Sequence, residues 1–212
     1  MSKIEIVPAI LVKDKEDFAR KIASVSAHVK RVQIDIMDGK FVPNITLAPE
    51  EFPSIPKHLL VEYHLMVEHP LEYVQRIGKK GAIYELHIES LKGIGVEKAV
   101  AAVKKMGGRV ALAISPDTPV SAVAPYLSQV EYVLVMTVYP GFSGQKYLPA
   151  MEEKMRVLSA QGVVVEVDGG VGLGSARSAA AAGATLLGVA SAIFAQPDVA
   201  RAIKKVKKDA EG

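Results

Sequence analysis

Residues 32–39 read VQIDIMDG, and residues 165–170 read VEVDGG. Each stretch is a short run rich in β-branched residues that leads to an aspartate, Asp35 or Asp168, shortly before a glycine. A strand that ends this way delivers a carboxylate to the mouth of a sheet or barrel. Two acids that arrive from distant strands can face opposite sides of one carbon atom. This arrangement suits proton removal on one side and proton return on the other.

Apolar strand-like runs alternate with helix-like segments along the whole chain. We predict strands at Ile4–Ile10, Val32–Ile36, Leu59–Leu65, Ala82–Ile88, Arg109–Ile114, Tyr132–Met136, Val163–Val167 and Thr185–Val189. We predict helices at Lys15–His28, Leu71–Lys79, Val96–Met106, Ala150–Ala160 and Ser175–Ala182, whereas three prolines between residues 48 and 58 predict a short or broken helix. Eight strand–helix units in 212 residues predict an α/β fold, a (β/α)8 barrel, as a single domain over residues 1–212. A doubly wound open sheet is the alternative.

The composition narrows the class of protein. Half of the residues are hydrophobic, tryptophan is absent, and cysteine is absent, which excludes disulfides, thiolate nucleophiles and cysteine-ligated metals. The segment Met1–Glu5 lacks the features of a signal peptide, and no apolar run approaches the ~20 residues that span a bilayer. The net charge of +3 lies largely in the tail at residues 204–208, which we interpret as the solvated end of a final helix. We therefore expect a cytoplasmic protein without a membrane or nucleic-acid partner; a basic binding patch is the alternative, but no aromatic residues interleave with these lysines.

Small residues follow the last three predicted strands. The loop after the sixth strand contains Gly141, Phe142, Ser143 and Gly144; Gly169 and Gly170 follow the seventh strand, and Ala190 and Ser191 follow the eighth and open a short helical stretch. Small residues let backbone N–H groups approach an anion, and a helix N-terminus favours negative charge. Barrels often bind phosphate with the loops after their last strands. Ordinary tight turns are the alternative, but three such loops at neighbouring positions favour a phosphate site.

Further candidates lie at strand ends that point into the same mouth. His64 would join Asp35 and Asp168, and one imidazole with two carboxylates suits a divalent metal ion; a structural histidine is the alternative. Three methionines near strand ends are either core filler or an apolar floor that keeps water from a reacting carbon: Met37, Met66 and Met136. Of the other histidines, His87 either lines the barrel or packs, and surface positions are expected for His28, His58 and His69. For Asp38 we expect a role in stabilising a turn.

Long ordered stretches of the chain resemble the ribulose-phosphate 3-epimerase family. They are residues 35–46 (DIMDGKFVPNIT), 64–67 (HLMV), 136–145 (MTVYPGFSGQ) and 166–171 (EVDGGV). The resemblance implies a (β/α)8 barrel that interconverts D-ribulose 5-phosphate and D-xylulose 5-phosphate in the pentose phosphate pathway. It implies an acid–base pair in Asp35 and Asp168, which with His64 would also bind one divalent metal ion (Zn, Mn, Fe, Co or Mg). It also implies the methionine cushion, the phosphate loops named above and a homo-oligomer, commonly a dimer or hexamer.

Three positions depart from the family pattern. Gln33 stands where a histidine metal ligand is expected, Ala9 where a serine is expected, and Ala190 where a glycine of the last phosphate loop is expected. Gln33 offers an amide oxygen, so the site should favour manganese or magnesium relative to zinc, or bind metal weakly or not at all. Ala190 is tolerated only if its backbone does not need a positive φ.

Loss of the proton beside a ketone gives an enediolate, whose charge a metal ion can stabilise. We assign Asp35 as the base in one direction and Asp168 in the reverse. The alternatives are an epimerase for another ketose phosphate, such as a six-carbon sugar phosphate, and a sugar-phosphate-binding barrel without catalysis. A barrel aldolase or synthase is disfavoured, because no lysine stands at a predicted strand end.

Overall fold

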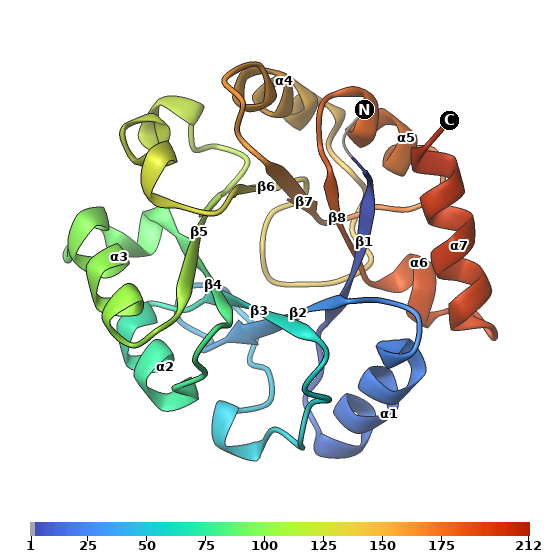
Figure 1. Cartoon of the computed structure of the whole chain (residues 1–212), viewed down its shortest axis with the longest axis horizontal. Helices are drawn as coiled ribbons and strands as arrows, with labels where there is room; N and C mark the ends of the chain where they lie inside the picture. Colours follow the sequence, from blue (N-terminus) through green and yellow to red (C-terminus); the bar gives the residue numbers. More distant parts are fainter. Residues whose placement is uncertain (1–2) are drawn as a thin grey trace.

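The computed structural model describes residues 3–212 as a closed barrel of parallel strands surrounded by helices (Figure 1). The first two residues, Met1 and Ser2, lie outside the described residues. They belong to the segment Met1–Glu5, for which we expect no signal peptide. The strands are β1 (Glu5–Ile10), β2 (Arg31–Met37), β3 (Leu60–Met66), β4 (Ile83–His87), β5 (Arg109–Ile114), β6 (Val133–Met136), β7 (Val165–Asp168) and β8 (Leu186–Val189). All eight predicted strands are confirmed, with small differences at their ends.

Pairing of the first strand with the last closes the barrel. β1 pairs in parallel with both β2 and β8, and each further strand pairs with its neighbour in chain order. A doubly wound sheet would leave two open edges, so this pairing excludes the alternative topology. The prediction of a (β/α)8 barrel is confirmed.

Helices cover the outside of the barrel (Figure 1). They are α1 (Lys15–Ser26), α2 (Pro70–Ile77), α3 (Val96–Lys105), α4 (Glu152–Ala160), α5 (Ser175–Ala181), α6 (Ser191–Phe194) and α7 (Val199–Ala210). Two connections carry 3₁₀ turns instead of an α-helix: Pro49–Glu51 after β2, and Val120–Ala122 with Ala124–Gln129 after β5. The proline-rich segment before β3 is thus short, as its composition predicts. None of the helices in residues 3–212 combines the length and the apolar character needed to span a bilayer.

The alternation of side chains along each strand separates two kinds of environment. On β2, the even positions Val32, Ile34 and Ile36 belong to the large apolar core shared with the surrounding helices. The odd positions Gln33 and Asp35 point into the barrel, where Gln33 contacts Asp168 of β7 and Asp35 contacts His64 of β3. The interior is therefore polar in part, unlike the apolar layer outside it.

The register of the strands brings the polar interior positions to one level. Asp35 of β2 lies beside His64 of β3, and Ala9 of β1 lies beside Gln33. Across the barrel, Asp168 of β7 lies between Met136 of β6 and Gly188 of β8. These positions lie toward the carboxyl ends of the strands, the end at which barrels of this type carry their chemistry.

Candidate active site

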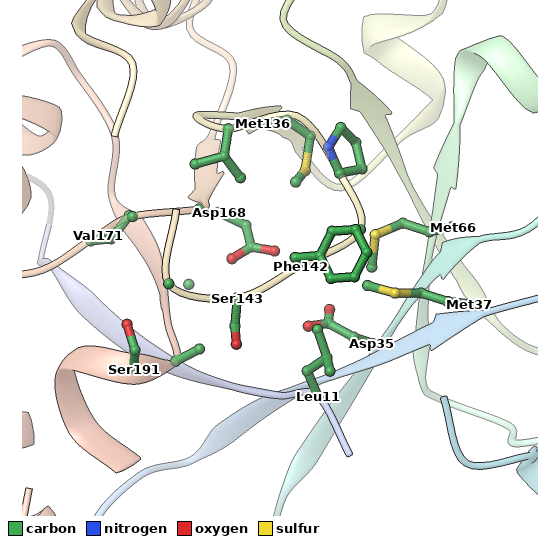
Figure 2. A pocket seen from close by; sticks show the side chains of 18 residues that line it. Leu11, Asp35, Met37, Met66, Met136, Phe142, Ser143, Asp168, Val171 and Ser191 are labelled. Carbon is green, nitrogen blue, oxygen red and sulfur yellow. The ribbon is translucent and has the colours of Figure 1, made fainter. Parts of the chain in front are cut away.

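A pocket opens at the carboxyl ends of the strands, and Asp35 and Asp168 face each other within it (Figure 2). The loop after β6 runs across this end of the barrel (Figure 1). The lining residues are Leu11, Asp35, Met37, Met66, Met136, Val138, Pro140, Gly141, Phe142, Ser143, Gly144, Asp168, Gly169, Gly170, Val171, Gly188, Ala190 and Ser191. Every residue that the sequence suggested for phosphate, acid–base or methionine roles lies in this set.

Behind the two acids lie His64 and Gln33, which are fully buried. His64 Nδ1 lies 3.1 Å from Asp35 Oδ1 and 3.5 Å from Asp168 Oδ2. The Gln33 amide nitrogen donates to Asp35 Oδ1 at 2.8 Å and to Asp168 Oδ2 at 2.9 Å. Four strand-borne side chains thus converge on a single point below the pocket, and both carboxyl groups are held in place from beneath.

His64 and Asp168 influence each other's protonation. Burial opposes a charge on His64, but its hydrogen bonds to Asp168 and Asp35 outweigh burial and raise the pKa of His64 to about 10. Burial also opposes the charge on Asp168, but the hydrogen bonds and charge of His64 hold the pKa of Asp168 below its usual value. At neutral pH the site therefore contains an imidazolium beside an ionised Asp168.

The same groups form a donor set for a metal ion. Asp35, His64 and Asp168 each offer one ligand atom, and these atoms lie within 4.8 Å of one another. The fourth side chain, Gln33, directs its amide nitrogen toward this point, while its amide oxygen is buried without a hydrogen-bond partner among the described residues. A half-turn of the amide exchanges the two atoms and offers the oxygen as a ligand. Two carboxylates, an imidazole and an amide oxygen then suit a divalent ion that accepts oxygen ligands.

Three thioethers form one wall beside the acids (Figure 2). Met37, Met66 and Met136 are all buried, and Met37 and Met66 belong to a small apolar cluster with Val42. Leu11 adds a further apolar surface to the pocket. A wall of this kind excludes water from the space between the two carboxyl groups.

The loops after β6, β7 and β8 line the opposite part of the pocket. Gly170 has a φ of +66°, and a Cβ at this position would lie 2.4 Å from the backbone nitrogen of Tyr147, so the loops meet only because residue 170 is glycine. Ala190 has a φ of −106°. The alanine therefore meets the condition stated from the sequence, because its backbone does not need the left-handed region.

Hydrogen bonds from the loop after β2 hold the rim of the pocket. Asp38 accepts from the backbone N–H groups of Lys40, Phe41 and Glu68, which confirms its expected role in a turn. Asn44 donates to the carbonyl oxygen of Gly141 at 2.7 Å. This bond ties the loop after β2 to the glycine loop after β6.

Sequence reasoning missed several groups around the site. Five more residues line the pocket, and the sequence indicates them only because they lie next to the motifs: Leu11, Val138, Pro140, Val171 and Gly188. For His87 the sequence allows either a place lining the barrel or a packing role. It is buried, its Nε2 lies 2.9 Å from His64 Nε2, and the Phe41 ring packs against it. The other three histidines are exposed, as expected. A second buried acidic group lies deeper in the barrel and had no sequence signal as a set: Glu62, Glu85 and Glu166.

Known proteins resemble this chain over most of its length. The profile of the "Ribulose-phosphate 3 epimerase family" matches residues 5–194. The cytoplasmic isoform of ribulose-phosphate 3-epimerase from Oryza sativa subsp. japonica is 37% identical over 220 residues, covering 98% of this chain and 95% of the relative. The ribulose-phosphate 3-epimerase of Methanocaldococcus jannaschii is 39% identical over 194 residues, covering 87% and 81%. A 3-hexulose-6-phosphate synthase structure from Salmonella typhimurium superposes with a TM-score of 0.69 at 14% identity, covering 98% of this chain and 99% of that one, which shows the fold alone.

Proposed function

Because the chain belongs to the ribulose-phosphate 3-epimerase family, we propose that it interconverts D-ribulose 5-phosphate and D-xylulose 5-phosphate. The observation that carries this proposal is the pair of carboxyl groups that face each other across one pocket, from β2 and from β7 (Figure 2). Inversion at a carbon atom needs a proton acceptor on one face and a proton donor on the other.

The substrate carbon lies between Asp35 and Asp168 in this proposal. One aspartate starts ionised and removes the proton from the carbon beside the ketone, which leaves a planar enediolate. The other starts protonated and returns its proton to the opposite face. Asp35 acts as the base in one direction and Asp168 in the reverse. The lowered pKa of Asp168 supports its role, because a base must be ionised before it can accept a proton.

Buried groups beneath the acids keep the reaction geometry fixed. The Gln33 amide holds both carboxyl groups through one nitrogen atom, and the positive charge on His64 offsets the negative charge of the ionised aspartate. The wall of Met37, Met66 and Met136 excludes water that would return a proton to the wrong face. These side chains lie on strands, so their positions are set by the barrel and not by mobile loops.

The phosphate group of the substrate is held by backbone N–H groups in the loops after β6, β7 and β8. Gly141, Gly144, Gly169 and Gly170 leave the backbone open to an anion, and Ser191 adds a hydroxyl. The side chains of Phe142 and Ser143 lie in the same loop, next to the pocket (Figure 2). Binding at this end places the sugar chain across the two acids.

We propose that Asp35, His64, Asp168 and the rotated Gln33 amide bind one divalent ion, with manganese or magnesium favoured over zinc. Such an ion supplies a Lewis acid that stabilises negative charge on the substrate oxygens. The Gln33 amide nitrogen now interacts with both carboxylates, so the ion has to replace these hydrogen bonds. Affinity should therefore be modest.

A coupled assay with ribulose 5-phosphate tests the proposed reaction. Asp35→Asn and Asp168→Asn should each lower kcat by roughly 10²–10⁴-fold, the usual contribution of a general acid or base, and leave phosphate binding nearly intact. Asp17→Asn is the control, because Asp17 forms an ion pair with Lys21 on the outer helix α1. Full turnover in both site variants would contradict the two-acid mechanism.

The same assay separates the proposal from its two alternatives. An epimerase for a six-carbon ketose phosphate would turn over that substrate faster than ribulose 5-phosphate. A binding barrel without catalysis would bind ribulose 5-phosphate yet show no exchange of its C3 proton with deuterated solvent. Running the assay with a chelator, and then with added Mn²⁺ or Mg²⁺, decides whether turnover needs the ion.

A further inference from the structure

A line of polar side chains leads from the candidate active site into the wall of the barrel. His64 Nε2 lies 2.9 Å from His87 Nε2, and His87 Nδ1 lies 3.2 Å from Glu89 Oε2. His64 and His87 are fully buried, and Glu89 is partly buried in the turn after β4. The line begins at the two reacting acids, because the other nitrogen of His64 faces Asp35 and Asp168.

The two imidazole rings meet through their edges. Their planes differ by 21°, and their centroids lie 5.1 Å apart. This separation is about the N–N distance plus the distance from each ring centroid to its own Nε2. The rings therefore lie end to end and nearly in one plane. The lone pair of one Nε2 therefore points at the N–H of the other, which is the geometry of a hydrogen bond.

The hydrogen-bonding capacity of Glu89 determines which imidazole ring donates. Glu89 has only acceptor oxygens when ionised, so His87 Nδ1 must carry the proton that faces it. A neutral His87 then has a bare Nε2, which accepts a hydrogen bond from His64 Nε2–H. Two N–H groups cannot face each other across 2.9 Å, so one of the two Nε2 atoms carries no proton. The order of protons is fixed from Glu89 inward, and His64 presents Nδ1 to the two acids.

The carboxylate at the outer end is itself held by several bonds. Glu89 Oε1 accepts from the backbone N–H of Ser115 at 2.8 Å and from the Thr118 hydroxyl. Burial opposes ionisation of Glu89, but its hydrogen bonds, first that to His87, lower its pKa to about 2. Lys154 donates to the carbonyl oxygens of the same loop after β5, at Ser115, Pro116 and Thr118. Glu89 is therefore a fixed, ionised acceptor.

We propose that His87 and Glu89 are positioning residues that hold His64 in a single orientation and proton arrangement, with Nδ1 facing Asp35 and Asp168. This inference rests on the proposed function, because it assigns His64 a role beside the reacting acids. In the absence of the pair, the His64 ring loses the acceptor for its Nε2–H, and only Asp35 and Asp168 then fix its orientation. The same constraint would pre-orient Nδ1 toward a divalent ion, since neighbours of this kind commonly tune metal-binding histidines.

Imidazole nitrogen NMR on ¹⁵N-histidine-labelled, metal-free protein tests the proton order without any substrate. The unsubstituted protein should show His87 protonated at Nδ1 and bare at Nε2. A His87 that is bare at Nδ1 would overturn the inference whatever any variant does. This measurement is independent of turnover, so an inactive protein with the expected His87 spectrum would count against the proposed function and not against the positioning pair.

Variants at the outer end test whether Glu89 imposes this order. Glu89→Leu removes the acceptor, so we expect His87 to populate both tautomers and the His64 resonances to shift. Glu89→Gln retains an amide oxygen that can accept from His87 Nδ1–H, so it should largely preserve the His87 tautomer. It also provides a second test if the leucine variant does not fold. An unchanged His87 tautomer in a folded Glu89→Leu protein would overturn the inference.

Two matched controls separate positioning from packing. Glu97→Leu makes the same substitution at an exposed glutamate on α3. His58→Gln changes an exposed histidine whose ring bonds only to the Ser26 carbonyl oxygen among the described residues. Both should leave the His64 and His87 spectra unchanged. Calorimetric titration with Mn²⁺ gives a second readout, with affinity expected to fall about 10–100-fold in Glu89→Leu and to stay within about twofold in both controls.

Discussion

Gln33 sits at the centre of the candidate site and distinguishes this chain from the pattern that its sequence resembles. Its amide nitrogen donates to both reacting carboxylates, and the His64 imidazolium supplies the positive charge nearby. The two acids are thus satisfied by protein donors alone. An ion that binds here competes with a proton on His64 and with two hydrogen bonds from Gln33.

Restoring an imidazole at this position should strengthen metal binding. We expect Gln33→His to tighten Mn²⁺ and Zn²⁺ binding by about 10–100-fold, with the larger gain for zinc, because nitrogen replaces an amide oxygen in the ligand set. Isothermal titration calorimetry measures both affinities. Gln161→His is the control, since Gln161 is exposed and its side chain bonds only to the Val157 carbonyl oxygen among the described contacts. Equal affinity in Gln33→His and the unsubstituted chain would argue against a ligand role for residue 33.

At the scale of elements, strands β3, β4 and β7 build a second acidic layer beneath the candidate site. Glu62, Glu85 and Glu166 are fully buried, and the Tyr132 hydroxyl lies 2.7 Å from Glu62 Oε1 and 2.9 Å from Glu85 Oε1. A hydroxyl carries a single proton, which these two acceptor oxygens share. Burial raises the pKa of both carboxyl groups, and Arg31 pairs with Glu62 from the other side.

This layer makes the stability of the barrel depend on pH. Burial, with the negative charge of Glu62, raises the pKa of Glu85 from 4.5 to about 8. The folded state thus favours the protonated acid, so this contribution to stability is complete below pH 4.5 and is lost as the pH rises through 8. Glu85→Gln cannot ionise and should raise the Tm at pH 8.5 by more than at pH 5.5.

Differential scanning calorimetry at the two pH values measures this difference. A gain of about 1 kcal/mol corresponds to roughly 2–4 °C for a chain of this size. Glu97→Gln, at an exposed position on α3, should shift the Tm by the same small amount at both pH values. A Glu85→Gln protein that is stabilised equally at pH 5.5 and pH 8.5 would show that Glu85 does not change its ionisation over this range.

The contact between the loops after β6 and β7 depends on one glycine. A Cβ on Gly170 would lie 2.4 Å from the Tyr147 nitrogen and 2.8 Å from the Gln145 carbonyl oxygen, both backbone atoms. Gly170→Ala should displace the loop that carries the proposed phosphate site and raise KM at least about tenfold, with a smaller effect on kcat, because the acids lie on strands.

Gly162→Ala separates this effect from backbone strain. Gly162 also has a positive φ, of +75°, but a Cβ there would meet no atom within 4 Å. It should cost about 1 kcal/mol of stability and leave KM unchanged. Steady-state kinetics on both variants, with thermal unfolding alongside, makes the comparison; equal KM values in the two variants would place the phosphate away from Gly170.

For the whole molecule, the periodicity of the sequence was sufficient to predict the barrel. Each strand is a short apolar run between turn residues, and eight such runs with short connections allow few other arrangements. The β2–β3 connection was predicted correctly because its prolines oppose a helix. The connection after β5 showed no helical pattern, and Pro119 and Pro125 accompany the 3₁₀ turns found there.

The site was predictable where each residue acts through its own position on a strand end. Asp35, His64 and Asp168 follow from strand ends alone, because all carboxyl ends of the strands meet at one mouth. The contact of His64 with His87 and the set of three buried glutamates depend on register and side-chain direction between strands. A single sequence does not specify these pairings. The orientation of the Gln33 amide likewise depends on which acceptors surround it.

Metal binding should stabilise the whole barrel. The proposed ligands come from β2, β3 and β7, so an ion at this point links strands that are far apart in the chain. Thermal unfolding with Mn²⁺ at about 100 times its dissociation constant should show a stabilisation of about 2.7 kcal/mol, which a chelator reverses. The shift should vanish in Asp168→Asn, with an equal ionic strength of NaCl as the control. A persistent shift in that variant would place the ion elsewhere.

The groups proposed to move protons stand on strands, whereas the groups proposed to grip the phosphate stand on loops. The strands are locked by their neighbours around a closed ring, but a loop can lengthen or shorten without disturbing that ring. A change in the length of the phosphate-binding loops would therefore place a longer or shorter sugar phosphate against the same two aspartates. In this protein the substrate that is bound and the reaction that it undergoes could therefore be engineered separately.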